Sequence, residues 1–286
     1  MKILAISGGG TLGYIAALYL HKLETHLTKP LYKEFDLICG VSTGAILGYS
    51  IASDIDPRDV VNLYLTRAEK IFSNKRGFFR SLFRPYYDIE NLEQVLIHEL
   101  DFDKIKDTDT NFMTYAVNVS DPLVKTDFWK SWRPSGDEVA AKAITASCAA
   151  PVYFSPYQLD GKVYLDGAIS TNNPAMAGIA EAIKLGANIE DIKVLNIGFR
   201  TIPSPSNPIK DLTGLLSVAT RLTEINMYAI EKMEAHQARV MLGDRYKYIT
   251  PDASLPIDSL DFTTMGMYAE NLWYDTYLDV LEMLRE

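Results

Sequence analysis

A serine between two glycines is the feature of this sequence with the clearest chemical potential. Residues 40–44 (GVSTG) follow an apolar run, residues 35–39, and precede a helix-like apolar run, residues 45–52. A serine on a sharp strand-to-helix turn has its hydroxyl exposed, and the N-terminal amides of the helix favour developing negative charge. Gly40 and Gly44 suit this turn because side chains there would clash with it. Ser42 is therefore the candidate nucleophile.

A glycine-rich loop follows the first apolar segment, and two different functions use such loops. Residues 8–13 (GGGTLG) fit the G-x-G-x-x-G pattern of a dinucleotide site. That site also needs an acidic residue at the end of the second strand, to hold the ribose. The candidate, Asp36, lies near the start of its strand instead. The dinucleotide interpretation therefore fails at its second requirement.

The other use of the loop is an oxyanion hole, in which backbone amides bind the negative charge of a tetrahedral acyl intermediate. Losing one such donor costs about 3–4 kcal/mol of transition-state stabilisation. The carboxyl-end loops of neighbouring parallel strands meet at the edge where α/β sheets bind ligands, which would place this loop beside Ser42. We expect the amides to come from Gly8, Gly9, Gly10 and Thr11, with Gly13 supporting the loop.

A serine nucleophile needs a base, and histidine is a poor candidate for that role in this chain. None of the histidines lies at a predicted strand end, and each is better explained as a helix or surface residue: His21, His26, His98 and His236. A Ser-His-Asp triad therefore has no suitable histidine.

Asp166 is the alternative base, because it ends a short apolar strand and precedes Gly167. Taken alone, this segment is better explained by an ordinary turn aspartate. Its unperturbed pKa, about 3.9, makes aspartate a weak base. A partly desolvated pocket would raise that pKa and make the carboxylate usable.

These residues sit in a chain that alternates predicted strands and helices. The strands are expected at residues 2–6, 35–39, 112–119, 124–132, 163–165, 192–198 and 246–249, and the helices at 14–27, after 42, from 57, at 88–100, 138–147, 173–185, 212–242 and 265–285. This order predicts a three-layer α/β/α fold with a mostly parallel sheet. We expect a single domain, residues 1–286, in which the helical part 209–286 packs on the portion that carries the motifs.

Composition limits the possible partners. The chain has 286 residues, a net charge of −9 and two cysteines. The negative charge argues against nucleic acid as a partner, and two cysteines cannot form a disulfide framework. No apolar run approaches the roughly 18 residues that a membrane span requires. The sequence therefore predicts a cytoplasmic protein, with no cofactor and no metal; it does not indicate an oligomeric state.

One basic segment stands out in this acidic chain. Residues 67–84 contain six basic residues and one acidic residue, interleaved with phenylalanines. Such a mixture suits an anionic membrane surface, whereas a solvated loop with aromatics packed on the core explains it equally well. We expect transient membrane contact through Lys75, Arg76, Phe78, Phe79, Arg80, Phe83 and Arg84.

Taken together, the ordered motifs resemble the patatin-like phospholipase family across residues 1 to about 200. They are G-G-G-x-x-G, then G-x-S-x-G after the second strand, then D-G-A at 166–168 followed by N-N-P at 172–174. Residues 146–154 (ASCAAPVYF) are similar to the A-S-x-A-A-P-x-Y-F segment of the family. The resemblance implies a serine–aspartate dyad, Ser42 and Asp166, that hydrolyses fatty-acyl esters of lipids or phospholipids through an acyl-enzyme, without a metal.

The sequence departs from the family pattern at two places. Leu12 stands where the family often has arginine or lysine, which removes a cation that could fix the loop or a phosphate. Residues 198–200 are GFR where G-T-G is frequent. Two alternatives therefore stay open: a general carboxylesterase or thioesterase, and a catalytically weak module of the same fold that binds a membrane or a partner.

Overall fold

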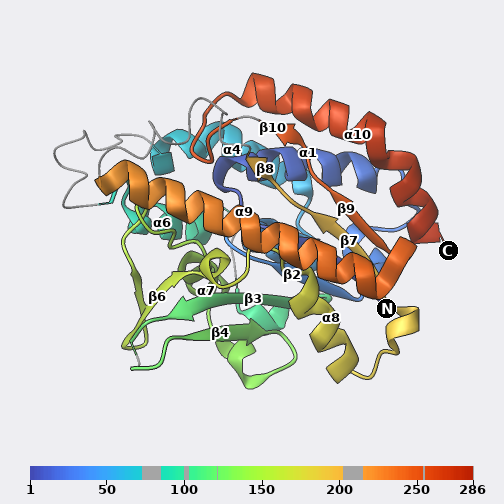
Figure 1. Cartoon of the computed structure of the whole chain (residues 1–286), viewed down its shortest axis with the longest axis horizontal. Coiled ribbons are helices and arrows are strands. Elements are labelled where there is room, and N and C mark those ends of the chain that lie inside the picture. The colour runs from blue at the N-terminus through green and yellow to red at the C-terminus, as the bar shows by residue number, and fades with distance from the viewer. Residues whose placement is uncertain (73–84, 100–102, 121, 202–214, 254, 286) are drawn as a thin grey trace.

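The computed structural model describes residues 1–72, 85–99, 103–120, 122–201, 215–253 and 255–285 (Figure 1). Within these residues an eight-stranded sheet has the order β5-β6-β3-β2-β1-β7-β9, with β4 also paired to β3. Its parallel strands are β3 (Asn111–Asn118), β2 (Leu37–Gly40), β1 (Lys2–Ile6), β7 (Lys193–Ile197) and β9 (Tyr246–Ile249). A separate two-stranded sheet joins β8 (Arg200–Thr201) to β10 (Asp252–Ala253).

Strand β3 organises the antiparallel end of the main sheet. It pairs with β4 (Lys125–Lys130) from Met113 to Asn118, which occupies one edge of the strand. The other edge is shared, because β2 pairs with the first residues of β3 and β6 (Lys162–Asp166) pairs antiparallel with the last. The end of β6 therefore meets the end of β2. Strand β5 (Tyr157–Leu159) completes this side of the sheet.

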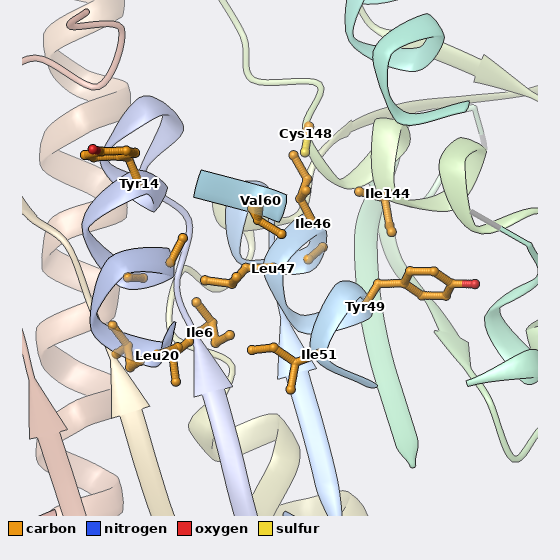
Figure 2. Packing of buried hydrophobic residues seen from close by; sticks show 14 of the residues in the cluster. Ile6, Tyr14, Leu20, Ile46, Leu47, Tyr49, Ile51, Val60, Ile144 and Cys148 are labelled. Atoms are coloured by element: carbon orange, nitrogen blue, oxygen red, sulfur yellow. The ribbon is translucent and has the colours of Figure 1, made fainter. Parts of the chain in front are cut away.

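Two layers of helices cover the two faces of the sheet. The larger core packs alternate strand residues such as Leu4 and Ile6 against α1 (Gly13–Glu24), α3 (Thr43–Ala52), α4 (Pro57–Phe72), α6 (Ile89–Glu99), α7 (Ala140–Ser147) and α10 (Phe262–Arg285) (Figures 1 and 2). The smaller core packs Ile3 and Ala5 against α8 (Ala175–Lys184) and α9 (Leu215–Leu242). This alternation follows from the two-residue period of a strand.

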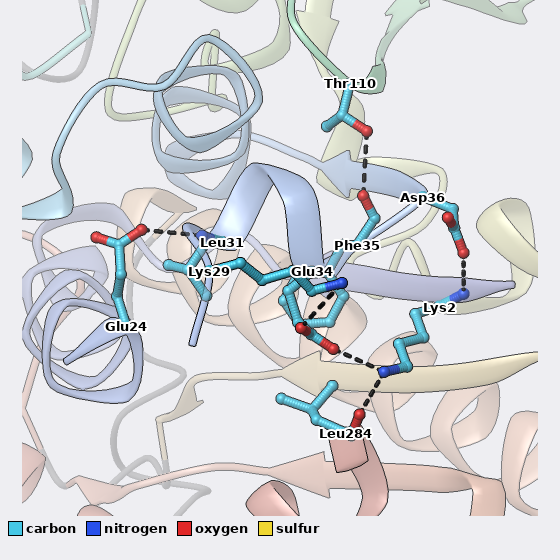
Figure 3. A network of polar contacts seen from close by, with 9 residues as sticks. All are labelled: Lys2, Glu24, Lys29, Leu31, Glu34, Phe35, Asp36, Thr110 and Leu284. Atoms are coloured by element: carbon cyan, nitrogen blue, oxygen red, sulfur yellow. Dashed lines mark hydrogen bonds and ion pairs between the residues drawn. The ribbon is translucent and has the colours of Figure 1, made fainter. Parts of the chain in front are cut away.

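A polar network ties the amino end of the sheet to the C-terminal helix (Figure 3). Lys2 Nζ donates to Glu34 Oε1 at 2.7 Å, in the short helix α2 (Leu31–Glu34), and to the carbonyl of Leu284 on α10. Asp36 Oδ2 accepts the backbone N–H of Lys2 at 2.7 Å. Asp36 therefore fixes the beginning of β1, at the opposite end of that strand from the glycine loop. This position explains why it cannot serve a ligand held by that loop.

The predicted fold class is confirmed: helices flank both faces of a mostly parallel sheet. Most predicted elements appear with their ends shifted by a few residues, since tertiary pairing decides where a strand or helix stops. The sequence interpretation missed the short elements α2, β5, β8 and β10, together with the short 3-10 helices η1 (Gly10–Leu12), η2 (Ile105–Asp107), η3 (Pro134–Asp137), η4 (Gly167–Ile169), η5 (Ile189–Asp191) and η7 (Gly243–Arg245). Helix α10 packs along α1 (Figure 1); the single-domain assignment of residues 1–286 stays a prediction.

Two leucine-to-alanine substitutions test this layering. Leu4 on β1 is fully buried, whereas Leu65 on α4 is 50% exposed. Leu4→Ala should lower the free energy of unfolding by about 2–5 kcal/mol because it leaves a cavity between sheet and helices. Leu65→Ala should change it by no more than about 0.5 kcal/mol. Urea unfolding measures both, and equal losses would contradict the assignment of Leu4 to the core.

Candidate active site

Ser42 occupies a strained turn between β2 and α3. Its backbone angles are φ 54° and ψ −129°, which are unfavourable for a residue with a side chain. The turn is closed by a tight approach, since a Cβ on Gly44 would lie 2.1 Å from the carbonyl oxygen of Ile6. The N–H of Ser42 donates to Ser147 Oγ at 3.0 Å, at the end of α7. The surrounding structure therefore holds the serine in a conformation that costs about 1–3 kcal/mol.

The glycine loop after β1 lies directly beside this serine. A Cβ on Gly8 would come within 3.0 Å of Ser42 Cβ, so only glycine fits there without displacing the serine. Two amides of the loop already have acceptors: Gly8 N–H donates to Asn172 Oδ1 at 3.1 Å, and Thr11 N–H donates to the carbonyl of Ile257 at 2.8 Å. Within the described part of the chain, the N–H groups of Gly9 and Gly10 make no hydrogen bond.

The remaining glycines predicted to support the site lie at its structural joints. Gly13 begins α1, Gly40 ends β2 and Gly167 follows directly after Asp166. Each is tightly enclosed: a Cβ would come within 2.2 Å of Tyr64 Oη at Gly13, 2.1 Å of the Gly44 carbonyl oxygen at Gly40, and 2.3 Å of the Tyr115 carbonyl oxygen at Gly167.

Asp166 ends β6, and its side chain is 1% exposed. Its Oδ1 accepts the N–H of Ala168 at 2.8 Å, while its own N–H donates to the carbonyl of Ala149 at 2.9 Å. Oδ2 has no hydrogen-bond partner of ordinary geometry among the described residues. The Ser42 hydroxyl lies close enough to lower the pKa of this carboxyl group. One carboxylate oxygen is thus fixed by the backbone, and the other is left for an exchangeable partner.

The electrostatics of Asp166 suit proton transfer near neutral pH. Burial raises the pKa of Asp166 to about 7, against the smaller opposing effects of the Ala168 N–H and the Ser42 hydroxyl. A carboxylate with a pKa near the working pH can accept a hydroxyl proton and later return it. Cys148 lies beside the same groups, and burial raises the pKa of its thiol, which keeps it uncharged.

The end of α7 and the residues that follow it connect the Ser42 turn to Asp166. The sequence did not predict these contacts. Ser147 accepts hydrogen bonds from the Ser42 N–H and from Thr114 Oγ1, and Ala149 pairs with Asp166. From the sequence alone Asn172 is only part of the N-N-P motif, but in the structure its side-chain amide oxygen and nitrogen both bond to the backbone of Gly8. The signal was present in the ASCAAP and NNP segments, but spacing alone does not reveal these contacts.

An apolar cavity opens above Ser42 and Asp166. It encloses about 720 Å³ of space not filled by atoms, counting its open mouth. Gly9, Gly10, Ser42 and Asp166 line its polar end. The rest of the wall is almost entirely apolar and comes mainly from α3, α4, α6 and residues 148–154, including Ile46, Leu63, Tyr64, Ala68, Ile71, Phe72, Leu92, Tyr153 and Phe154. A site with this apolar lining and a few polar groups suits a hydrocarbon chain with one polar end.

The histidines have other roles in the described structure. His21 Nδ1 lies 3.4 Å from Asp56 Oδ1. The ring of His26 packs on that of Trp273, and His98 Nε2 contacts Gln94 Oε1. His236 is exposed on α9. None of the four lines the cavity.

The structure leaves some of the predicted site untested. The proposed membrane-contact residues, Lys75, Arg76, Phe78, Phe79, Arg80, Phe83 and Arg84, lie outside the described residues. Among the residues that are described, no group of three or more histidine, cysteine, aspartate or glutamate side chains could hold a metal ion. No helix in the described ranges is long and apolar enough to cross a bilayer.

Comparison with known proteins identifies the family. A family model described as patatin-like phospholipase matches residues 4–179. The chain belongs to the patatin-like phospholipase family. A cGAMP-activated phospholipase from Pseudomonas aeruginosa (strain BWHPSA011 / Pa011) is 30% identical over 92% of this chain and 83% of its own length. Family membership identifies this protein as an enzyme, a lipid acyl hydrolase.

One further relative and one solved structure are longer than this chain. The calcium-independent phospholipase A2-gamma of Oryctolagus cuniculus is 28% identical over 82% of this chain, which spans 32% of that enzyme. The crystal structure of VipD from Legionella pneumophila aligns with 99% of this chain and 66% of its own, with a TM-score of 0.54 and 13% identity. The likeness to VipD supports the fold alone.

The buried carboxyl group of Asp166 predicts a trade-off between stability and activity. Its folded-state pKa of about 7 lies above the unfolded value of 3.8, so the folded state retains a proton that the unfolded state has lost between these values. Its contribution to stability is therefore complete below pH 4 and is lost as the pH rises through 7. Asp166→Asn should become more stable than the wild type as the pH rises from 5 to 8. Urea unfolding at each pH measures the difference; parallel curves would contradict the assignment.

Proposed function

We propose that this protein hydrolyses fatty-acyl esters of lipids or phospholipids through a serine–aspartate dyad. The observation that carries the proposal is that Ser42, on its strained turn, and the buried Asp166 line the same apolar cavity, with the Ser42 hydroxyl near enough to lower the pKa of Asp166. In this mechanism Asp166 accepts the Ser42 hydroxyl proton as Oγ attacks the ester carbonyl carbon. The acyl-oxygen bond then breaks, the proton passes to the leaving alcohol, and the acyl group stays on Ser42.

Deacylation reverses the same proton transfers. Asp166 accepts a proton from a water molecule as that water attacks the acyl-enzyme, and then returns it to Ser42 Oγ as the fatty acid leaves. The single carboxylate is sufficient because its raised pKa allows it to gain and lose a proton near neutral pH. No histidine is required in either half of the cycle.

The oxyanion hole of this mechanism is assigned to Gly9 and Gly10. Both residues line the cavity and their amides have no acceptor among the described residues, whereas the amides of Gly8 and Thr11 are already bonded. Two donors aimed at the developing oxyanion would stabilise it by several kcal/mol, at about 3–4 kcal/mol per donor. Gly8 and Thr11 then hold the ends of the loop in place.

The cavity wall supports lipids over short soluble esters as substrates. A long acyl chain would bury its methylene groups against α3, α4 and α6, and each buried CH₂ contributes about 0.8 kcal/mol. Since long-chain lipids reside in membranes, we include transient contact with a membrane surface in the proposal. A carboxylesterase or thioesterase acting on short soluble esters is the second candidate; it would leave most of this apolar wall unused.

Substitution of either member of the dyad should abolish most of the activity. Ser42→Ala and Asp166→Asn should each lower kcat for phospholipid hydrolysis by at least about a thousandfold, because each removes a group that acts only together with the other. Ser135→Ala, in the turn η3 outside the cavity, is the matched serine control and should retain wild-type activity. Mass spectrometry of liposome products measures the rates, and thermal unfolding checks that each variant is folded.

Chemical labelling separates the enzyme from a binding module of the same fold. A fluorophosphonate probe should label wild type and Ser135→Ala, but not Ser42→Ala. Unlabelled wild type would favour the binding module, and full activity of folded Ser42→Ala would refute the dyad. Faster hydrolysis of short esters than of long-chain lipids, without activation by liposomes, would favour the soluble esterase.

The pH profile tests the role of Asp166 as a base. Because the deprotonated carboxylate is the active form, kcat/KM should rise with pH and level off above about pH 7, where Asp166 loses its proton. A profile that is flat from pH 5 to pH 8 for a slow chemical step would contradict this assignment.

A further inference from the structure

A buried glutamate on α9 lies behind the glycine loop, outside the residues 4–179 that the family model matches. Glu231 is 1% exposed and is not among the residues that line the cavity containing Ser42. Its Oε2 accepts Asn172 Nδ2 at 2.9 Å, and its Oε1 accepts Tyr248 Oη at 2.6 Å. The backbone of Phe199 lies close enough to lower the pKa of this carboxyl group. A buried carboxylate that accepts hydrogen bonds from several donors is held in a defined position.

The backbone near Glu231 is shaped to admit its carboxylate. A Cβ on Gly198 would lie 2.2 Å from Glu231 Oε1, so any other residue there would displace it. Gly198 directly follows β7, and its N–H donates to the carbonyl of Ile249 at 2.9 Å. The missing side chain at Gly198 leaves room for the carboxylate of Glu231. The backbone therefore fixes the position of Glu231 independently of its hydrogen bonds.

Asn172 connects this carboxylate to the glycine loop. Its Oδ1 accepts the Gly8 N–H at 3.1 Å, and its Nδ2 donates both to the Gly8 carbonyl at 3.3 Å and to Glu231. Since a carboxylate only accepts hydrogen bonds, Glu231 selects the orientation in which Nδ2 faces it. In that orientation the side-chain amide pairs with both the N–H and the carbonyl of Gly8, and so with the peptide groups on both sides of that residue.

Gly8 directly precedes Gly9 and Gly10, whose N–H groups are the two free amides of the loop. Fixing it limits the directions in which the N–H groups of Gly9 and Gly10 can point. Phe199 also packs closely against the loop, because a Cβ on Gly9 would lie 2.5 Å from its ring. Oxyanion donors must be aimed within a few tenths of an ångström to be effective, and a misplacement of about 1 Å can reduce the rate about a hundredfold.

We propose that Glu231 is a positioning residue for the oxyanion loop, acting through Asn172 on the Gly8 peptide. The inference rests on the proposed function, because it assumes that Gly9 and Gly10 stabilise the acyl intermediate. It makes the reaction depend on α9, which lies outside the residues that the family model matches. Glu231 contacts neither the substrate nor Ser42. It acts by fixing the direction in which the N–H groups of the glycine loop point.

Two substitutions at Glu231 distinguish position from charge. Glu231→Gln keeps the length of the side chain and an oxygen that can accept from Asn172, but removes the charge. Glu231→Asp keeps the charge but withdraws the carboxylate by one methylene. A positioning role predicts kcat for Glu231→Gln within about threefold of wild type, and a loss of about tenfold to a hundredfold for Glu231→Asp, with KM little changed in both. The reverse order would overturn the proposal.

A double-mutant cycle tests the path through Asn172. Glu231→Leu and Asn172→Ala should each lower kcat, and the double variant should lose much less than the product of the two effects, since both disturb the same peptide. Multiplying effects would overturn the path. Glu181→Leu is the matched control: Glu181 is a buried glutamate on α8, paired with Lys130 and Lys184, and its loss should reduce stability but not kcat.

The failure of this inference can be told from the failure of the proposed function. Loss of activity in Ser42→Ala together with wild-type kcat in Glu231→Asp and Glu231→Leu would refute the positioning role alone. Retained activity in Ser42→Ala would refute the dyad, and the inference with it. If Glu231→Leu does not fold, the comparison of Glu231→Gln with Glu231→Asp still decides the question.

Discussion

The site depends on one constraint, the meeting of two strand ends on the same edge of β3. Because β4 occupies the opposite edge, β2 and β6 must lie end to end, and the turn after β2 faces the turn after β6. Ser42 and Asp166 are 124 positions apart in the sequence, yet this pairing brings them together. The strain at Ser42 and the burial of Asp166 persist because the same strands also form the hydrophobic core.

Burial gives the carboxylate its chemistry and lowers stability at the same time. A solvated aspartate would have a pKa near 3.9 and little ability to take a proton from serine. The enclosed position of Asp166 raises the pKa to about 7, which makes it an effective base only because the fold bears the cost of an ionised buried group. Burial likewise raises the pKa of Glu231 and of Glu234 to about 7, so the carboxylates behind the site share this property.

The glycine loop is supported by contacts that the sequence did not predict. Leu12 replaces the basic residue frequent in the family, and it is fully buried in the larger core, where a cation would be unfavourable. The loop is held instead by Asn172 on Gly8 and by the carbonyl of Ile257 on Thr11. Apolar packing thus anchors one end of the loop, and polar contacts with distant segments fix the peptides that would stabilise the oxyanion.

The sequence by itself determined the fold class, the family, and Ser42 and Asp166 as the candidate dyad, because glycine turns at strand ends are local patterns with strong steric requirements. It also excluded a dinucleotide site, since the position of Asp36 within its strand is visible from the apolar pattern. Only the tertiary structure decided which loop amides are free, how far the pKa of Asp166 is raised, and that Ser147, Asn172 and Glu231 support the site. These properties depend on long-range hydrogen bonds and burial, which arise when segments far apart in the chain pack together and which no local spacing can specify.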